Sequence, residues 1–397
     1  MLSCMHEHDG PLTRLRRSHE QAVLELLRKH GPLSRAELGD RSGLSRTTLH
    51  DIVAGLVGNG SVVVATPHVE VRKRGRPVEK LSLNPAAGEA VGIDFARRAV
   101  HVAAVNFAHE VIGSASEAHA ADLSWPERID IAERLLAAPG AVHLDALSAI
   151  GVGVVGPITD PGSEKARARG TDGLPDLLRK RFGVPVLLDN NTRLAALAEA
   201  VWGAAADSSD VLYLRLSHGV GGGLVVGGAL HRGRNGLSGE FGHITVDPAG
   251  RPCECGGSGC LETRASLDAV LYRYREAGGR ADDLAAFLDA AVAGERSALD
   301  VLERVGIDIG GVLAAVCQAV GPGVIVVGGE LAEAGPALLG PVERALREQL
   351  MPMARPHVDV RRATLGETGS ALGGIALVLH ESPLLSHYPR PGSEEDA

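Results

Sequence analysis

Apolar and polar residues follow two different patterns along the chain, and the pattern changes near residue 85. Before that point apolar residues recur at helical spacing, as Leu24, Leu26 and Leu27 do in the stretch 19–30, which Gly31-Pro32 ends. After residue 90 they form short β-branched runs between longer stretches of helical character. The second pattern is typical of a buried sheet covered by helices. The sequence therefore predicts a small helical head and an α/β body.

The head has the element order of a winged helix-turn-helix. Ser34 and Glu37 have capping-box spacing, and Ser45 is placed to cap a third helix that ends near residues 58–60. Two expected strands, "SVVVA" and "EKLSLN", flank the basic loop "EVRKRGRPV". Three short helices and a hairpin make this fold. We expect it over residues 19–84, after a flexible N-terminus at residues 1–18.

Six apolar runs of the body are expected to be strands: "AVGIDFA", "AVHVAAVNF", "AIGVGVVG", "VPVLLDNN", "VLYLRL" and "GVIVVGGE". The longest uncharged run, residues 309–329, contains Gln318 and the turn Gly321-Pro322-Gly323. It predicts a helix, a turn and a buried strand rather than a membrane span. A short linker is expected at residues 83–88, and the tail 387–397 is expected to be flexible.

Charge separates the head from the body. Residues 1–85 carry 13 Lys and Arg against 9 Asp and Glu, whereas the whole chain of 397 residues has a net charge of −9. A basic head on an acidic body predicts that the head alone holds any anionic polymer. Chance variation in surface charge is the alternative. The first 18 residues lack the apolar core of a signal peptide, so we expect a cytoplasmic protein with no membrane partner.

The stretch "GEFGHITVDPAGRPCECGGSGCLE" holds three of the five cysteines of the chain. Together with one histidine they form the set His243, Cys253, Cys255 and Cys260. Three thiolates and one imidazole suit tetrahedral Zn²⁺, and the glycines between them allow a short loop to fold around one ion. Four protein ligands leave no open position for a water molecule. We therefore expect one structural zinc per chain, with a chance cluster of buried cysteines as the alternative.

These motifs together resemble the ROK family, a name that stands for repressors, open reading frames and sugar kinases. The resemblance runs from about residue 19 to 380 and is carried by "PLSRAEL", "GLSRTTLHDIV", "RGRP", "VGIDFA", "GVGVVGPI", "LDNNTRLAALAE", "GVGGGLVVGGALHRGRNGLSGEFGHI", "CECGGSGCLE" and "VIVVGGEL". It implies a body over residues 88–386 of two α/β lobes of the actin and hexokinase type. A sugar would bind between the lobes, and the zinc loop would span residues 239–262.

The resemblance also implies which residues contact the sugar: Asn190, Asn191, Glu240, His243 and Glu262. The histidine belongs to the zinc set as well. If one nitrogen of His243 binds zinc, the other is free to donate a hydrogen bond to a ligand hydroxyl, and the metal fixes the tautomer. Two solvated glutamates beside a structural zinc are the alternative.

Kinase chemistry is not expected, because three features of the family's kinases are missing. Their catalytic Asp aligns with Asn191, whose amide has no useful basicity, and Asp189 is not expected to replace it. Their Gly-Gly-Thr phosphate turn is replaced by Phe95-Ala96-Arg97-Arg98, and their Gly-Thr-Gly turn by Ser217-His218-Gly219. We therefore assign no catalytic residue and expect no enzyme. An active sugar kinase with a DNA-binding head is the alternative.

DNA contacts are expected from two parts of the head. The start of the third helix offers five candidates for the major groove: Ser45, Arg46, Thr47, Thr48 and His50. Arg74 and Arg76 in the wing loop are candidates for an A·T-rich minor groove, with plain phosphate contacts as the alternative. A helical adaptor that never meets DNA is the alternative for the whole head.

The expected function is a sugar-responsive transcriptional regulator, a repressor of carbohydrate-metabolism genes. A homodimer would place two heads on an inverted-repeat operator. A small sugar or sugar derivative would bind the DNA-free form more tightly than the DNA-bound form. A regulator that has lost its sugar and answers to another signal is a further alternative.

Overall fold

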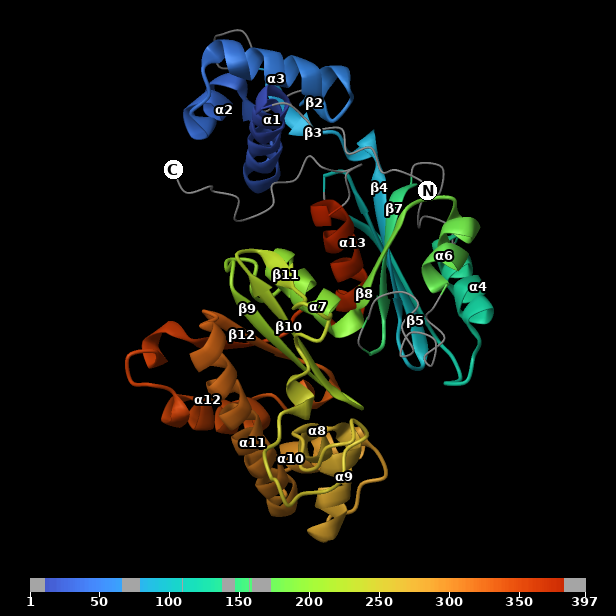
Figure 1. The fold of residues 1–397 in the computed structure, drawn as a ribbon, viewed down its shortest axis with the longest axis vertical. Coiled ribbons are helices and arrows are strands. Elements are labelled where there is room, and N and C mark those ends of the chain that lie inside the picture. Colours follow the sequence, from blue (N-terminus) through green and yellow to red (C-terminus); the bar gives the residue numbers. More distant parts are fainter. Residues whose placement is uncertain are drawn as a thin grey trace.

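A computed structural model describes residues 11–65, 79–108, 110–137, 147–156, 158 and 173–381. The head lies at one end of the molecule and the two lobes of the body follow it, with the second lobe farthest away (Figure 1). The winged helix-turn-helix followed by an α/β body confirms the expected fold class.

The head contains three helices and a three-stranded sheet in the order β1-β3-β2. Ser34 Oγ accepts from the Glu37 N–H at 3.3 Å, and Glu37 Oε2 accepts from the Ser34 N–H at 2.7 Å, so the expected capping box is present. Gly43, at φ +69°, ends the second helix. The elements are α1 (Pro11–His30), β1 (Leu33–Ser34), α2 (Arg35–Ser42), α3 (Arg46–Gly58), β2 (Val62–Ala65) and β3 (Lys80–Leu83).

The first helix is longer than the sequence analysis predicted. It begins at Pro11 and so takes in residues 11–18, which were expected to be flexible. An ion pair between Arg16 and Glu20, 3.1 Å apart at helical i,i+4 spacing, joins this added part to the expected one. Residues 1–10, the wing-loop arginines and the tail 387–397 lie outside the described residues.

The junction between head and body is ordered. Asn84 Oδ1 accepts from the Ala86 N–H at 3.1 Å, and its Nδ2 donates to the Gly60 carbonyl at 2.7 Å. A short 3₁₀ helix, Pro85–Ala87, follows it. Phe107 and Ala108 of the first lobe also pack against the apolar core of the head. The head therefore contacts the first lobe through the linker and through these two side chains.

Both lobes are built on a five-stranded sheet with one shared topology. The strand orders are β6-β5-β4-β7-β8 and β11-β10-β9-β12-β13. In each sheet the first three strands in sequence are antiparallel, and the last two lie parallel to the first. The expected two α/β lobes are thus two copies of one arrangement.

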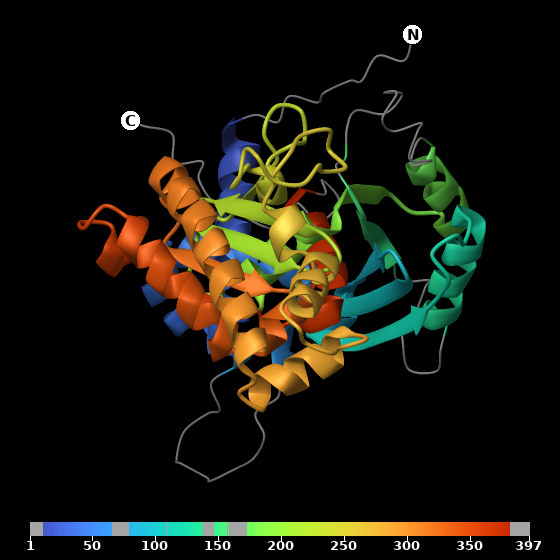
Figure 2. The same ribbon diagram turned by 90° about the horizontal axis from the view of Figure 1, so that it is seen from below.

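The first lobe also contains two helices on its outer face. Figure 2 shows α4 and α6 side by side along one side of the sheet. An apolar cluster is buried between these helices and β4, β5 and β7. The elements are β4 (Glu89–Phe95), β5 (Ala99–Asn106), β6 (Val111–Ala118), α4 (Trp125–Leu136), β7 (Leu147–Val154), α6 (Leu174–Phe182), β8 (Val186–Asn190) and α7 (Asn191–Val201).

The second lobe buries one large apolar cluster between its sheet and α11. Gly321, at φ +68°, ends α11, and the strand β12 follows, so the run 309–329 is the predicted helix, turn and strand. No helix in the described part of the chain combines the length and apolar character that a membrane crossing needs. The elements are β9 (Val211–Leu216), β10 (Val220–Val226), β11 (Ala229–His231), η3 (Phe241–His243), α8 (Glu262–Ala265), α9 (Leu267–Glu276), α10 (Leu284–Val292), α11 (Arg296–Val320), β12 (Val324–Gly328), η4 (Glu330–Ala334), α12 (Pro336–Gln349), η5 (Arg355–His357), β13 (Asp359–Arg362) and η6 (Gly366–Thr368).

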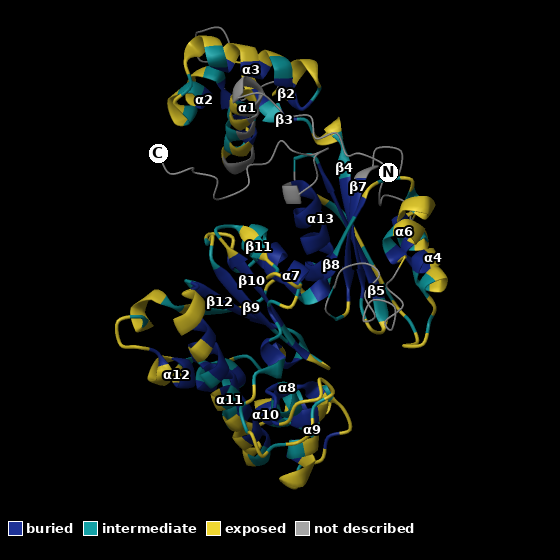
Figure 3. Ribbon diagram, viewed as in Figure 1, coloured by how far each residue is buried: buried dark blue, intermediate teal, exposed yellow. Residues whose placement is uncertain are grey.

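The last helix, α13 (Gly369–Glu381), returns to the first lobe and packs closely on its sheet and on α7. A Cβ atom at Gly92 would lie 1.7 Å from the Ala371 carbonyl oxygen, and one at Gly373 would lie 1.8 Å from that of Leu194. Most of α13 is buried (Figure 3). Since α7 also packs on β9 and β10, the pair α7–α13 joins the two lobes.

We predict that two glycine-to-alanine changes in helices will have opposite effects. Gly340→Ala in α12 meets no atom within 4 Å and should stabilise the protein by about 0.5–1 kcal/mol, because alanine favours the helix. Gly373→Ala should destabilise it by about 3 kcal/mol or more, because its Cβ meets backbone. Urea unfolding measures both. Equal effects would show that α13 is free to shift away from α7.

Candidate metal and effector site

Four predicted metal ligands come together in the loop that follows β11. The donor atoms of His243, Cys253, Cys255 and Cys260 all lie within 4.8 Å of one another. Cys253 Sγ is 3.6 Å from His243 Nδ1, and Cys255 Sγ is 3.6 Å from Cys260 Sγ. Burial raises the pKa of the Cys260 thiol to about 12, and the Gly257 N–H lowers that of Cys255. The cluster has the composition of a metal site.

The backbone holds this loop in a compact form. Thr245 pairs with Cys260, and Pro252 pairs with Ser258, in two isolated β-bridges. Gly259 has φ +64°, and a Cβ there would lie 1.5 Å from the Asp247 carbonyl oxygen. Only glycine fits that position. The backbone fold of the loop therefore helps to set the distances between the cysteines.

The three predicted sugar ligands of the second lobe meet around the start of β10. Glu262, the first residue of α8, accepts the Val220 N–H through Oε2 at 2.9 Å. Gly242 lies against the Val220 carbonyl, where a Cβ would be 2.0 Å from the oxygen. The short helix η3 that carries His243 is thereby held on the same strand as Glu262.

The ring of His243 faces two different groups. Its Nδ1 lies toward Cys253, whereas its Nε2 lies 3.8 Å from Glu240 Oε2. The side chains of Glu240 and His243 are 33% and 32% exposed, so both remain accessible from solvent. Nδ1 is thus placed toward the cysteines and Nε2 toward Glu240, and the role of His243 as both metal ligand and sugar contact stays a prediction.

Asn190 has a structural role in addition to any ligand contact. Its Oδ1 caps α7 by accepting from the N–H groups of Thr192 and Arg193, and its Nδ2 donates to the Gly156 carbonyl at 2.9 Å. A carboxamide has two amide hydrogens, so one remains for a ligand. The role of Asn190 as a sugar contact stays a prediction.

Asn191 lies beside a buried carboxylate. A Cβ on Gly153 would lie 3.1 Å from Asp94 Oδ1 and 3.2 Å from Asn191 Cβ, which places the two side chains together. Among the described residues Asp94 Oδ1 has no hydrogen-bond partner. Burial raises the pKa of Asp94, and Arg215 of β9 is the strongest influence in the opposite direction. An amide at position 191 avoids a second negative charge here.

A buried ion cluster links the first lobe to the loop that leads to Glu240. Asp189 is 1% exposed and pairs with Arg193 at 2.6 Å and with Arg232. Arg193 also donates to the Gly236 carbonyl at 2.6 Å. The sequence analysis did not assign these arginines to the site. The sequence held one signal for Arg193: it is an arginine inside an apolar helix, four residues after Asp189.

The two turns that replace the kinase phosphate turns are filled or closed. Phe95 is buried, and its ring meets that of Trp125 edge-on at 5.4 Å. The Ser217 N–H donates to the Gly219 carbonyl at 3.0 Å and closes the β9–β10 hairpin. Phe95 is thus part of the apolar core of the first lobe at the end of β4, and the exclusion of phosphate by this turn stays a prediction.

In the head, α3 presents its first residues to solvent. Ser45, Arg46, Thr47 and His50 are exposed, and Thr48 is half-buried. The hydroxyls of Ser45 and Thr48 lie 2.8 Å apart, and Ser45 Oγ accepts the Thr48 N–H as the N-cap. These two hydroxyls thus take part in the cap, while the side chains of Arg46 and Thr47 are exposed to solvent. Their DNA contacts stay predictions, as do those of Arg74 and Arg76, which lie outside the described residues.

Comparison with known proteins places this two-lobed body and its head in one class. The profile of the ROK family matches residues 91–381, and that of a winged helix-turn-helix DNA-binding domain matches residues 16–60. The chain belongs to the ROK family and has an N-terminal winged helix-turn-helix.

Three proteins illustrate what this chain is similar to. The DNA-binding transcriptional dual regulator NagC of Escherichia coli is 28% identical over 93% of this chain and 94% of its own. A glucokinase of Halalkalibacterium halodurans is 35% identical, but over 52% of this chain and 67% of its own. The crystal structure of a ROK family transcriptional regulator, a homologue of the E. coli Mlc protein, has the same fold. Its TM-score is 0.76 at 24% identity, over 94% of this chain and 97% of its own.

We predict that Asp94→Asn will raise the melting temperature at pH 8. The folded-state pKa of Asp94 lies above its usual value of 3.8, so the buried charge destabilises the fold above that folded pKa. The gain should be about 2–4 °C, the shift expected from roughly 1 kcal/mol in a domain of this size. It should shrink as the pH falls through the folded-state pKa toward 3.8, because folded Asp94 then takes up a proton and its burial no longer involves a charge.

Asp122→Asn is the matched control, because Asp122 is exposed. Its melting temperature should follow that of the wild type at every pH. A loss of stability in Asp94→Asn at pH 8 would contradict the prediction and show that the carboxylate is stabilised by its neighbours.

Proposed function

We propose that this chain is a sugar-responsive repressor that binds operator DNA. The observation that carries the proposal is the group Glu240, His243 and Glu262 gathered around Val220, in a chain whose head is a winged helix-turn-helix. Relatives that cover more than nine-tenths of this chain support it by their names: NagC, Mlc and the xylose repressor of Bacillus spizizenii.

The metal of this proposal is zinc, in a structural role. Zn–S bonds of about 2.3 Å in a tetrahedral site place two sulfurs ~3.8 Å apart. The 3.6 Å between Cys255 Sγ and Cys260 Sγ is close to that edge. When bound, zinc supplies a cross-link within the loop. His243 would bind it through Nδ1 and hold Nε2 toward the ligand.

The side chains of the site suit the hydroxyl groups of a sugar. Glu240 and Glu262 are acceptors, and His243 Nε2 is a donor when Nδ1 binds the metal. Asn190 adds one free amide hydrogen from the first lobe. Because the acceptors belong to the second lobe and Asn190 to the first, a bound sugar would draw the lobes together.

The similarity to a glucokinase makes an active sugar kinase the second candidate. Three features disfavour it. Asn191 offers no base to the sugar hydroxyl. Asp189, the nearby carboxylate in sequence, is bound by two arginines. The turn after β4 carries the side chains of Ala96, Arg97 and Arg98 where the kinases have Gly-Gly-Thr, which disfavours close backbone approach by a phosphate.

For DNA, we propose that α3 lies in the major groove. Arg46 and Thr47 stand in its first turn with exposed side chains, where base-reading residues lie in helix-turn-helix proteins. A homodimer would place two such helices on an inverted repeat. The head is fixed to the first lobe by its linker and by Phe107, so movement of that lobe would move the head.

We predict about one zinc per purified chain and its loss in Cys255→Ser, because the described residues contain a single four-ligand set. Metal analysis and thermal unfolding measure this. The variant should melt at a lower temperature and bind sugar more weakly, since the loop that carries His243 loses its cross-link. Cys317→Ala, a buried cysteine outside the cluster, should keep the metal. Full zinc content in Cys255→Ser would contradict the site.

We predict that sugar releases the wild type from its operator but not Glu240→Gln. The coupling should be about 1–3 kcal/mol, or roughly 5–150-fold in affinity. Operator affinity is measured with and without saturating sugar at one fixed salt concentration, because phosphate contacts depend on salt. The variant should bind operator like the wild type and keep its zinc.

Glu254→Gln is the matched control, because it changes the same charge in the same loop at an exposed position outside the proposed sugar set. It should respond to sugar normally. The proposal fails if a panel of hexoses leaves operator binding of the wild type unchanged. Consumption of ATP with a hexose would favour the kinase instead.

A further inference from the structure

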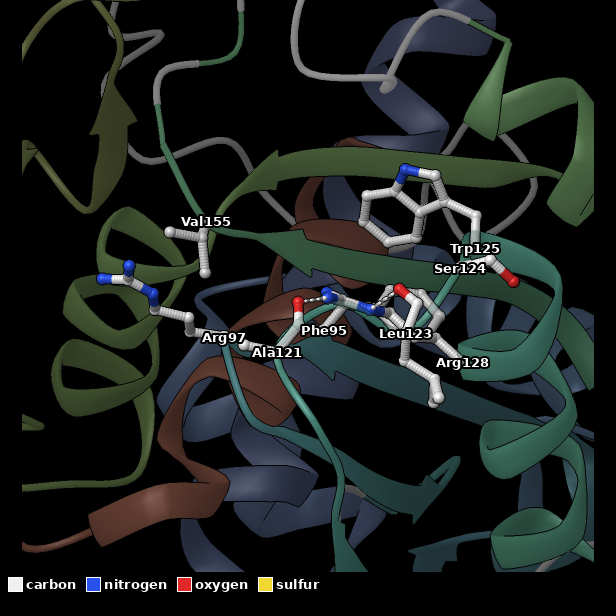
Figure 4. A pocket seen from close by; sticks show the side chains of 8 residues that line it. All are labelled: Phe95, Arg97, Ala121, Leu123, Ser124, Trp125, Arg128 and Val155. Carbon is white, nitrogen blue, oxygen red and sulfur yellow. Dashed lines mark hydrogen bonds between the residues drawn. The ribbon is translucent and has the colours of Figure 1, made fainter.

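A cavity lies in the first lobe, at the ends of β4 and β7 and beside the start of α4. Its volume is about 390 Å³, within the range of small-ligand pockets. In Figure 4, Arg97 and Val155 stand on one side of it, and Leu123, Trp125 and Arg128 stand on the other. None of these residues belongs to the metal cluster or to the proposed sugar set.

Among the described residues, the two charged groups that line the cavity are both cations, Arg97 and Arg128. Arg97 makes no hydrogen bond or ion pair with any residue that the structure describes, and none of the described residues that line the cavity is an Asp or a Glu. Glu127, in the first turn of α4, does not line the cavity, and its carboxylate accepts hydrogen bonds from the N–H and hydroxyl of Ser124, at 2.9 and 2.6 Å. The cavity therefore favours a negatively charged ligand.

Arg128 is fixed in place before any ligand arrives. Its Nε donates to the Leu123 carbonyl at 2.9 Å, and one Nη donates to the Ala121 carbonyl at 3.0 Å. Its guanidinium also lies over the Trp125 ring, 5.3 Å from the centroid. Partial burial lowers the pKa of Arg128. Three of its five N–H groups remain for a ligand. Because the guanidinium is already held in place, binding a ligand costs little further side-chain entropy.

The remaining walls are apolar and aromatic. Phe95 and Trp125 meet edge to face, and Leu123 and Val155 add aliphatic surface. An inorganic ion would leave this surface uncovered. A ligand with both an anionic group and an apolar or ring-shaped body would use both kinds of wall.

We propose that this cavity binds a small organic oxyanion, a phosphate or carboxylate attached to a ring. Arg128 binds the oxyanion, and the exposed side chain of Arg97, whose guanidinium points away from Arg128 in Figure 4, turns in to contact it. Trp125, Leu123 and Val155 cover the ring. The turn that excludes the phosphates of ATP, Phe95-Ala96-Arg97-Arg98, supplies one of the two cations. The site stands on its own residues and does not require the sugar site to be occupied.

Tryptophan fluorescence tests the proposal directly. The chain has two tryptophans, of which Trp125 lines the cavity and Trp202 does not. The full-length protein is titrated with phenyl phosphate, glucose 6-phosphate, glucuronate and inorganic phosphate. At least one of the three organic anions should bind more tightly than inorganic phosphate. Comparison of glucuronate with the two phosphate esters identifies the preferred oxyanion.

Arg97→Gln should weaken binding of the best anion by roughly tenfold or more, as loss of a charge-assisted hydrogen bond does. Its melting temperature should equal that of the wild type, because Arg97 makes no bond with the described residues. Arg98→Gln is the matched control. It removes the same charge from the next residue, which is exposed and does not line the cavity, and it should bind like the wild type.

Three outcomes would overturn the proposal. In the first, none of the four anions binds. In the second, inorganic phosphate binds as tightly as the organic anions, which would show that the aromatic wall takes no part. In the third, Arg97→Gln and Arg98→Gln bind the best anion equally well. Failure of the sugar-release experiment would leave this site unaffected, because the two tests use different residues and different ligands.

Discussion

The buried carboxylate of Asp189 connects the parts of the body on which the ligand site depends. It is almost inaccessible to solvent, and two arginines neutralise it. Removal of either partner would leave a buried charge without full compensation, which is costly. Through Arg232 and the Gly236 carbonyl, the same cluster ties the loop before Glu240 to the end of β8. The position of a second-lobe carboxylate is therefore set partly from the first lobe.

The sequence predicted those elements whose signals are local. The capping box of Ser34 and Glu37, the cap at Ser45 and the turn at Gly321 each depend on a few neighbouring residues, and all are present. The metal cluster was predictable for the same reason, because its ligands lie within one short loop. The proposed sugar-contacting residues could be predicted only from the resemblance to a family, because they lie far apart in the chain.

Other parts of the structure have no such local signal. The edge strand β6 has mixed polar residues rather than an apolar run. The strand β10 contains three glycines because Phe241, Thr192 and Ala196 pack directly on its backbone. Asp94 was expected at the end of a strand, yet its burial beside Asn191 depends on how α13 and α7 meet the sheet. The anion-binding cavity likewise depends on packing between β4, β7 and α4, which no single stretch of sequence reveals.

The return of α13 to the first lobe has a consequence for synthesis of the protein. The head and the second lobe are each continuous in sequence, so each has all its strands and helices once its own segment has left the ribosome. One face of the first-lobe sheet lacks its covering helix α13 until residue 381 has been made, about three hundred residues after β4 begins. The apolar residues on that face, among them Ala90, Ala103 and Val105, must wait uncovered, and this lobe is therefore exposed to aggregation and to chaperones for longer than the head.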